Sequence, residues 1–317
     1  MKEFFRLKIR LWGLMTVAGM VSCLCTLTGF IGQVWWIFDL TSHFRVQYAV
    51  GLSFLACVFA MARKLKPALL FVGFALFNCA VVVPHGWFGR AAVKPTGQTL
   101  RVMLINVHTE NQRYDLVKAC IRENNPDLVV IEEVDGRWLG QLAGLHDAYP
   151  HSCSEPREDN FGILLLSKLL LENSEIVYLG DSEVPSVTAT VKFGDKRLTL
   201  LGTHPLPPAS RENTSLRDEQ LSAIPKFLNG RKGSVVLLGD LNTTPWSHCF
   251  KRLLRDAGLA DSSRGFGLQP SWPADLFLLG IPIDHCLLTP DLKVVNRRIA
   301  SDVGSDHFPV VVEIIAP

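Results

Sequence analysis

The first third of the chain alternates apolar stretches with short basic segments, and this pattern restricts the fold more than any other feature. Three stretches, at about residues 11–32, 46–62 and 67–84, contain no charged residue. A helix needs about 20 apolar residues to cross roughly 30 Å of hydrocarbon, and the second and third stretches are at the short end of that range. The sequence therefore predicts a three-helix transmembrane region within residues 1–88. A cleaved signal peptide would explain only the first stretch, and buried helices of a soluble protein are the alternative.

The positions of lysine and arginine predict how this region is oriented. Residues 1–94 carry ten Lys and Arg but only two Asp and Glu, and most of the basic residues precede the first stretch or fill the second connection, residues 63–66. The first connection carries one basic residue, Arg45. Positive residues favour the cytoplasmic side, so we expect the N-terminus and the second connection there. Three spans then predict a multi-pass protein of the inner (plasma) membrane whose remaining domain is periplasmic or otherwise extracytoplasmic.

The remainder of the chain has the composition of a globular domain, residues 99–317, which follows a linker at residues 89–98. From residue 95 onward there are 22 Lys and Arg against 28 Asp and Glu, so the domain lacks the broad positive surface of a tight nucleic-acid binder. Many apolar strands with few helices predict an α+β fold in which two sheets pack together with helices outside. We expect strands at 99–107, 127–134, 161–167, 186–193, 197–204, 234–240, 284–290 and 309–315, and helices at 115–124 and 214–228.

Polar residues recur where these apolar strands begin or end. They are Asn106, Glu132, Glu133, His204, Asp240, Asn242, Asp284, Asp306 and His307. Strand ends of a sandwich can meet at one rim, so we expect these side chains to converge. Carboxylate and amide oxygens beside imidazoles suit Mg²⁺ or Mn²⁺ and proton transfer to a phosphate ester. The alternative for a single one of these residues is a turn, loop or core position.

The motifs at these strand ends resemble those of a known family. The sequences NPDLVVIEEV, GTH, GDLN, IDH and GSDH occur in the order found in the endonuclease/exonuclease/phosphatase family, and the resemblance covers about residues 99–316. That family includes exonuclease III-like and deoxyribonuclease-like nucleases, neutral sphingomyelinases and inositol-polyphosphate phosphatases. The three-span N-terminus resembles a bacterial membrane-anchored subgroup. The resemblance implies a four-layered α/β sandwich, with two packed mixed sheets flanked by helices, and phosphoester hydrolysis assisted by Mg²⁺ or Mn²⁺.

The resemblance also implies which residues bind the metal. Glu133 matches the metal-binding glutamate of the family, Asn106 matches the asparagine that supports the metal site, and Asp306 matches an aspartate on the metal side. Glu132 stands where many members have Gln, and we expect its side chain to form a salt bridge or meet solvent rather than bind metal.

The catalytic roles are implied in the same way. His204 matches the histidine that holds the scissile phosphate, and Asn242 matches a residue that binds phosphate or the transition state. Asp240 orients the nucleophilic water, and two-residue spacing within a strand would let Asp240 and Asn242 face one phosphate. His307 matches the general acid/base, and Asp284 matches its carboxylate partner, which would hold the tautomer of the imidazole.

These observations predict a membrane-anchored, divalent-metal-dependent phosphoesterase that hydrolyses phosphodiester bonds, either a nuclease or a phospholipid phosphodiesterase. Its expected partners are the lipid bilayer, through three transmembrane helices, and a nucleic-acid or phospholipid substrate, with no protein partner. The alternative is a catalytically silent family member that acts as a membrane-tethered binding protein. A serine hydrolase built on Ser305, Asp306 and His307 is disfavoured because adjacent residues cannot align as nucleophile, base and orienting group. Trp272 could stack on a base, insert near lipid or pack in the core.

Overall fold

The computed structural model describes residues 11–87, 98–231 and 233–316. It divides into two compact units. The helical unit contains the N-terminal helices, and the sandwich unit contains two β-sheets with the helices around them. The predicted linker, residues 89–98, lies outside the described residues except for residue 98.

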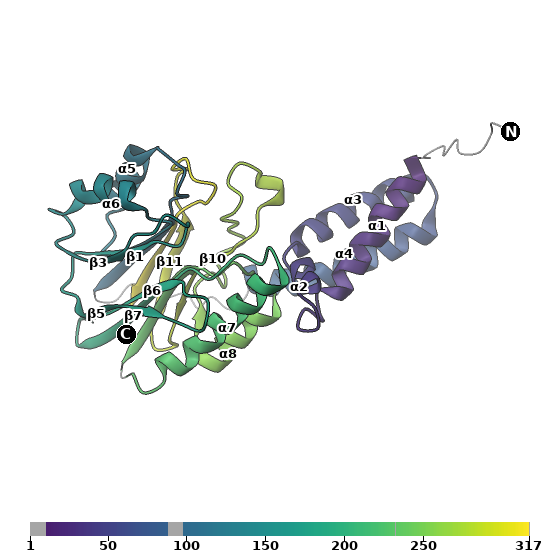
Figure 1. Ribbon diagram of the computed structural model, residues 1–317. Helices are drawn as coiled ribbons and strands as arrows, with labels where there is room; N and C mark the ends of the chain where they lie inside the picture. The colour runs from purple at the N-terminus through teal and green to yellow at the C-terminus, as the bar shows by residue number, and fades with distance from the viewer. Residues whose placement is uncertain (1–10, 88–97, 232, 317) are drawn as a thin grey trace. The chain divides into compact units, whose positions relative to one another are not determined.

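The helical unit consists of α-helices (Figure 1). Many of their large apolar side chains are exposed on the outside. Phe59 and Phe71 pack inside it, and Phe71 fills the space left by Gly19, where a Cβ atom would lie 2.3 Å from the phenyl ring. Val17 and Leu69 are examples of side chains that stay mostly exposed on the outside. Such an exterior is expected of helices surrounded by lipid. The helices are α1 (Leu11–Thr28), α2 (Trp36–Ser42), α3 (Arg45–Met61) and α4 (Leu65–Trp87).

The predicted count of three membrane spans is confirmed only in part. By length and composition, α1 and α4 could each cross a membrane. Helix α3 has 17 residues and qualifies only together with α2, from which it is bent by 65°. The helices therefore provide two candidate spans, or three if α2 and α3 form one broken span. The first span is shorter than the predicted 11–32, because α1 ends at Thr28, just before Gly29.

Arg45 lies inside the helical unit, whereas the sequence placed it in a connection. Its side chain is buried at the start of α3, and its Nη1 atom lies 3.4 Å from both the Thr26 carbonyl oxygen and Asn78 Oδ1. Its guanidinium group stacks over the Phe30 ring at 4.0 Å. A charged group inside an apolar bundle has to be paired in this way. Arg45 is therefore part of the packing of these helices.

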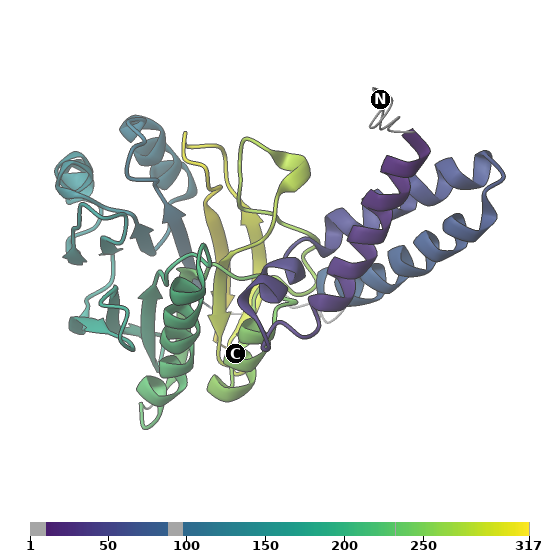
Figure 2. The same cartoon turned by 45° about the vertical axis from the view of Figure 1, so that its right-hand side comes forward.

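The sandwich unit contains two six-stranded sheets packed face to face (Figures 1 and 2). Their strand orders are β11-β12-β1-β2-β4-β3 and β5-β6-β7-β8-β10-β9. Each sheet has one parallel pair, β1–β2 or β7–β8, and its other neighbours are antiparallel, so both sheets are mixed. The strands are β1 (Thr99–Asn106), β2 (Leu128–Glu132), β3 (His151–Glu155), β4 (Ile163–Ser167), β5 (Glu172–Tyr178), β6 (Pro185–Phe193), β7 (Lys196–Thr203), β8 (Ser234–Asp240), β9 (Ala260–Asp261), β10 (Asp284–Leu288), β11 (Lys293–Ile299) and β12 (Val310–Ile315).

Helices cover the outer face of each sheet. Helices α5 (Tyr114–Asn124) and α6 (Gly136–Leu142) pack on the first sheet, and a 3₁₀ turn, η1 (Ala143–Leu145), follows α6. Helices α7 (Arg211–Leu228) and α8 (His248–Ala257) pack on the second. Helix, sheet, sheet and helix form four layers, so the predicted α/β sandwich is confirmed.

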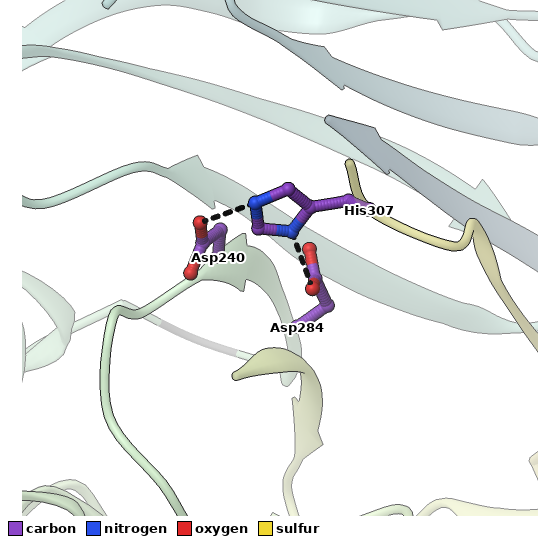
Figure 3. Close-up of side chains that lie close together, drawn as sticks. All are labelled: Asp240, Asp284 and His307. Carbon is purple, nitrogen blue, oxygen red and sulfur yellow. Dashed lines mark hydrogen bonds and ion pairs between the residues drawn. The ribbon is translucent and has the colours of Figure 1, made fainter. Parts of the chain in front are cut away.

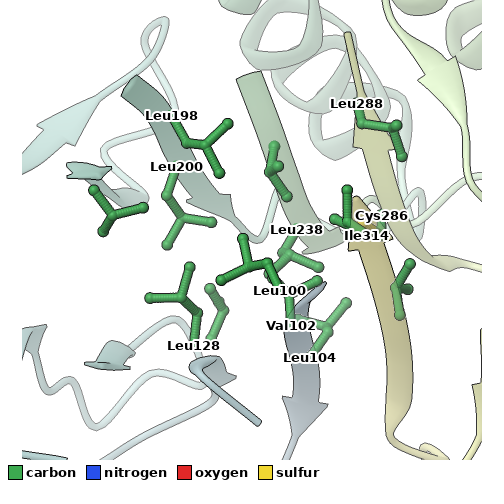
Figure 4. Packing of buried hydrophobic residues seen from close by; sticks show 14 of the residues in the cluster. Leu100, Val102, Leu104, Leu128, Leu198, Leu200, Leu238, Cys286, Leu288 and Ile314 are labelled. Carbon is green, nitrogen blue, oxygen red and sulfur yellow. The ribbon is translucent and has the colours of Figure 1, made fainter. Parts of the chain in front are cut away.

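Apolar side chains fill the space between the sheets (Figure 4). On β1, Leu100, Val102 and Leu104 face this interior, while Met103 and Ile105 face the helices. This alternation follows from the period of two in a strand. Strands with both faces covered contribute to two cores at once, and each buried large apolar side chain stabilises the fold by about 1.5–3 kcal/mol.

Gly202 of β7 marks a close approach between the two sheets. A Cβ atom at this position would lie 2.8 Å from Val187 Cγ1 and 2.9 Å from Val130 Cγ1. Val130 belongs to β2 of the opposite sheet, so the glycine of the GTH motif is required by packing. Strands β2 and β7 can thus bring the residues at their ends close together.

A buried carboxyl group connects the sheets at the same end. Glu132, the last residue of β2, is fully buried, and its two oxygens lie 3.3 and 3.0 Å from the donating backbone N–H of Asp240 on β8. Burial, together with the charges of Asp240 and Asp284, raises the pKa of Glu132 well above its ordinary value. Glu132 therefore keeps its proton to a higher pH than an exposed glutamate does. The expectation that it would form a salt bridge or meet solvent is wrong.

Replacing Gly202 by alanine should destabilise the protein, because the new methyl group would overlap valines from both sheets. We expect Gly202→Ala to lower the free energy of unfolding by about 1–3 kcal/mol. Gly144→Ala is the control, because a Cβ atom there meets nothing within 4 Å. Denaturant unfolding of the detergent-solubilised chain measures both. Equal stability of the two variants would contradict the packing role.

Replacing Glu132 by glutamine should stabilise the metal-free protein at alkaline pH. A carboxyl group whose pKa is raised by folding contributes its full stability below its unfolded pKa, and this contribution is lost as the pH rises. The glutamine would keep an acceptor for the Asp240 N–H but cannot ionise. In EDTA, we expect Glu132→Gln to be more stable than wild type by at least about 1 kcal/mol at pH 8, and the two proteins to be equally stable near pH 4. Denaturant unfolding at both pH values measures this, and a difference that does not change with pH would contradict the account.

Candidate active site

Strand pairing places two carboxylates opposite each other where strands β8 and β10 of the second sheet end and begin. Asp240 ends β8 and Asp284 begins β10, and the two residues are direct partners in the antiparallel ladder. The imidazole of His307 lies between them (Figure 3). Its Nδ1 atom is 2.9 Å from Asp284 Oδ2, and its Nε2 atom is 3.7 Å from Asp240 Oδ2. All three side chains are buried.

The charges of this group determine where its protons lie. Burial alone would lower the pKa of His307, but the charges of Asp284 and Asp240 and the hydrogen bond to Asp284 outweigh burial and raise it to about 10. Burial and the charge of Asp284 raise the pKa of Asp240 to about 8. Burial also opposes ionisation of Asp284, but the His307 charge and hydrogen bond lower its pKa overall. Asp284 is thus the permanent counter-ion of a protonated His307.

The GSDH motif holds His307 in place through Ser305. The Ser305 hydroxyl donates to the Asn106 carbonyl oxygen at 2.8 Å and accepts the His307 backbone N–H at 3.1 Å. Gly304 precedes it with φ of 81°, and a Cβ atom there would lie 2.7 Å from Arg113 Cγ. Ser305 therefore ties the motif to the end of β1, which supports a structural role over that of a nucleophile.

His204 lies on the other side of Asp240. Its Nε2 atom is 3.6 Å from Asp240 Oδ2, and its ring packs on Phe161 at a centroid distance of 5.3 Å. Burial lowers the pKa of His204, against the opposing charges of Glu133 and Asp306, so the ring is neutral. The buried Nδ1 atom has no hydrogen-bond partner within the described residues.

Glu133 is held in a left-handed backbone conformation at the end of β2. Its φ is 62°, which is uncommon for a residue other than glycine. The Asn106 amide donates to Glu133 Oε1 at 2.9 Å, and the Thr109 N–H donates to Oε2 at 3.2 Å. The Thr109 hydroxyl also donates to the Glu133 carbonyl oxygen. These hydrogen bonds fix the position of the Glu133 carboxylate. The contribution of Thr109 was not predicted from the sequence.

Asp306 presents a second carboxylate to the same region. The Trp272 indole N–H donates to Asp306 Oδ2 at 3.0 Å, and His108 Nδ1 lies 3.2 Å from Oδ1. Within the described residues, Oδ1 is buried and accepts no hydrogen bond. The carboxylate oxygens of Asp306 and Glu133 are of the kind that Mg²⁺ or Mn²⁺ prefers as ligands. Neither His108 nor Trp272 was predicted as a metal-site neighbour.

By spacing alone, a second group could hold a metal ion. Ligand atoms of Asp240, Asp284 and His307 all lie within 4.8 Å of one another. The Nδ1 atom of His307 is engaged by Asp284, however, and the raised pKa keeps its ring protonated. A protonated imidazole has no free lone pair for a metal. The geometry of this group therefore suits proton transfer better than metal binding.

Asn242 reaches the site from a turn, whereas its two-residue spacing from Asp240 suggested a position in the same strand. Strand β8 ends at Asp240, and Asn242 lies in the turn beyond it with φ of 49°. Its N–H donates to Asp240 Oδ1 at 2.9 Å, and its side-chain amide donates to the Pro205 carbonyl oxygen at 3.0 Å. The fully buried Arg217 donates to the Asn242 carbonyl oxygen at 3.1 Å. The expectation that both residues face one side of a strand is wrong, and Arg217 supports this turn from α7.

Comparison with known proteins identifies the family. The sequence model of the endonuclease/exonuclease/phosphatase family matches residues 103–307. No curated protein sequence matches the chain. Among solved structures, the chain is similar to an endonuclease/exonuclease/phosphatase from Beutenbergia cavernae, with a TM-score of 0.58 and 24% identity over 69% of this chain and 72% of that one.

Two further structures share the fold at lower identity. TDP2 from D. rerio, complexed with a single-strand DNA product, has a TM-score of 0.58 and 17% identity over 69% of this chain and 100% of that one. Sphingomyelinase C from Streptomyces griseocarneus has a TM-score of 0.53 and 19% identity over 68% and 99%. Because the family match spans more than half of the sequence and includes the strand ends described above, the chain belongs to the endonuclease/exonuclease/phosphatase family.

Proposed function

We propose that this protein is a membrane-anchored phosphoesterase that hydrolyses phosphodiester bonds with the help of a divalent metal ion. The observation that carries the proposal is the buried imidazole of His307 held between Asp284 and Asp240. Members of the family are in general metal-dependent hydrolases of phosphoester bonds. Asp284 pairs with His307, and Asp240 lies within 3.7 Å of both His307 and His204, so acidic and basic groups stand side by side in this site.

The residues that would hold the ion are Glu133 and Asp306, with Asn106 orienting the carboxylate of Glu133. Their carboxylate oxygens favour Mg²⁺ or Mn²⁺ over softer metals. When bound, such an ion polarises a phosphoryl oxygen and neutralises charge that develops on the phosphate.

The proton-transfer groups of the chain act on the water and the leaving group. Asp240 orients the nucleophilic water, and its raised pKa makes its carboxylate a stronger base than an exposed aspartate. His307 holds a proton at Nε2, the ring atom that faces Asp240, and can donate it to the leaving-group oxygen as the bond between that oxygen and phosphorus breaks. Asp284 fixes the ring through Nδ1 and keeps it protonated. Preorganised charges of this kind supply most of the catalysis in phosphoryl transfer.

His204 and Asn242 would hold the substrate phosphate. His204 is neutral, so one ring nitrogen can donate a hydrogen bond to a phosphoryl oxygen. The amide of Asn242 uses one N–H for the Pro205 carbonyl oxygen, which leaves the second for the phosphate. Both residues flank Asp240, where the water is held.

Activity of the full-length chain in detergent tests this proposal. We expect hydrolysis of bis(p-nitrophenyl) phosphate with Mg²⁺ or Mn²⁺ and its loss in EDTA. Asp240→Asn and His307→Ala should lower kcat at least about 100-fold, the usual contribution of a general acid or base. His146→Ala, which removes an exposed histidine, should leave kcat unchanged. A folded wild-type chain without activity on any phosphodiester would instead support the silent, membrane-tethered binding protein.

We further propose that the sandwich unit lies outside the cytoplasm. The basic N-terminus and the basic connection at residues 63–66 should both be cytoplasmic. With α1 and α4 as the only spans, that connection would lie on the opposite side from the N-terminus. With α2 and α3 as a third, broken span, both basic segments lie on the cytoplasmic side. The distribution of charge therefore favours three spans and an extracytoplasmic catalytic unit.

Reporter fusions measure this orientation directly. A phosphatase reporter that is active only outside the cytoplasm should be active when fused after residue 317 and inactive when fused after residue 64. A fluorescent reporter that matures only in the cytoplasm should give the opposite pattern. The reverse result for residue 317 would leave two spans and a cytoplasmic site.

A further inference from the structure

A loop of the sandwich unit exposes several apolar side chains together. Residues 273–280, here called the leucine loop, contain the short 3₁₀ turn η2 (Phe277–Leu279). The exposed fractions of Leu276, Leu278 and Leu279 are 54%, 86% and 49%. Elsewhere among the described side chains of this unit, only Leu116, Leu170 and Tyr178 are large, apolar and exposed, and they are scattered. A local group of this kind indicates a binding surface, whereas single exposed residues do not.

The base of this loop is attached to the candidate active site. Trp272 and Ile281 form an antiparallel bridge that closes the loop, with N···O distances of 3.1 and 2.6 Å. The Trp272 indole donates to Asp306, and its ring centroid is 6.4 Å from that of His307. The Ala274 N–H donates to the Asp306 carbonyl oxygen at 2.8 Å. The leucines are therefore carried by a segment whose base also lines the site.

The composition of the loop favours a bilayer as its partner. Asp275 is its one charged residue, so it has no Lys or Arg to attract an acidic protein or the headgroups of anionic lipid. Three leucines are also few for a stable protein partner, since a standard interface uses roughly 20–30 residues on each side. A few apolar side chains next to a tryptophan are instead typical of segments that enter the boundary between headgroups and hydrocarbon.

The covalent chain also tethers the unit that carries this loop to a candidate membrane span. Helix α4, a candidate span, ends at Trp87, and the first strand of the sandwich, β1, begins at Thr99, 12 residues later. Twelve residues span at most about 43 Å, so the covalent chain limits how far the start of β1 can lie from the end of the candidate span. Tethering at this distance raises the effective concentration of the membrane surface for any weakly binding loop.

We infer that the leucine loop inserts Leu276, Leu278 and Leu279 into the lipid bilayer and so holds the active site at the level of the headgroup phosphates. This inference rests on the proposed phosphoesterase function and names its substrate class: a phosphoester of an amphiphile that lies in the membrane. Insertion removes the three leucine side chains from water. Trp272, at the base of the loop, then lies between the lipid-embedded leucines and the catalytic residues. A soluble phosphodiester reaches the same residues without using the loop.

Photo-crosslinking tests the insertion independently of activity. The full-length chain carries p-benzoylphenylalanine in place of Leu278, or in place of Leu170 as an exposed control outside the loop, and is reconstituted in EDTA into vesicles of radiolabelled phosphatidylcholine. We expect at least tenfold more lipid adduct at position 278 than at position 170. Equal labelling of the two positions overturns the inference. A protein–protein adduct at position 278 overturns it in favour of a protein partner or a second copy of the chain.

The substrate class is tested with a triple variant, Leu276→Gln with Leu278→Gln and Leu279→Gln, and with Leu170→Gln as the control. Vesicles of phosphatidylcholine, phosphatidylethanolamine and phosphatidylglycerol provide membrane phosphoesters, and bis(p-nitrophenyl) phosphate is the soluble substrate. We expect the triple variant to lose at least tenfold of its activity on vesicles and less than twofold on the soluble ester, and Leu170→Gln to lose neither.

The outcomes separate this inference from the proposed function. Hydrolysis of the soluble ester without any hydrolysis of vesicle lipid overturns the inference and leaves the phosphoesterase intact. If the triple variant loses activity equally on vesicles and on the soluble ester, the leucines stabilise the site instead of binding lipid. That result also overturns the inference. If the wild-type chain hydrolyses neither substrate, the phosphoesterase proposal fails, and the substrate class fails with it.

Discussion

The close packing of the two sheets is the constraint on which the candidate site depends. Apolar residues fill the space between them, and Gly202 allows β7 of one sheet to approach β2 of the other. The ends of these strands then lie beside the end of β8, where Glu132 accepts the backbone N–H of Asp240. A side chain at Gly202 would separate the sheets and with them the residues that act together.

The same packing makes the site electrostatically unusual. Three carboxyl groups, those of Glu132, Asp240 and Asp284, are buried near one another, which no fold tolerates unless each is neutralised or paired. Burial raises the pKa of Glu132 and so favours its neutral form, Asp284 is paired with His307, and Asp240 lies between two imidazoles. The cost of these buried charges is offset by the apolar cores on either side of each sheet. The result is a fixed set of proton donors and acceptors that needs little rearrangement when a phosphate arrives.

Different parts of the chain use apolar residues for different purposes. In the strands they are buried from both sides and stabilise the sandwich. In α1 and α4 many of them remain exposed on the outside, and both helices are long and apolar enough to cross a membrane. The leucine loop is exposed in the same way but on the scale of a few residues, which suits contact with a surface better than passage through it.

The sequence by itself determined the strands whose two faces are both covered, such as β1 and β8, because continuous apolar residues have no other place in a sandwich. It also determined the order of the motifs, from which the family and most site residues could be predicted. The polar strands β3, β5 and β11 were not predicted, because their stability comes from backbone pairing with neighbours and little from their own side chains. Only the tertiary structure decided that the pKa of Glu132 is raised and that Asn242 leaves the strand in a turn. The state of Glu132 and the turn at Asn242 depend on burial and on contacts with residues distant in sequence. The spacing of nearby residues carries no information about such contacts.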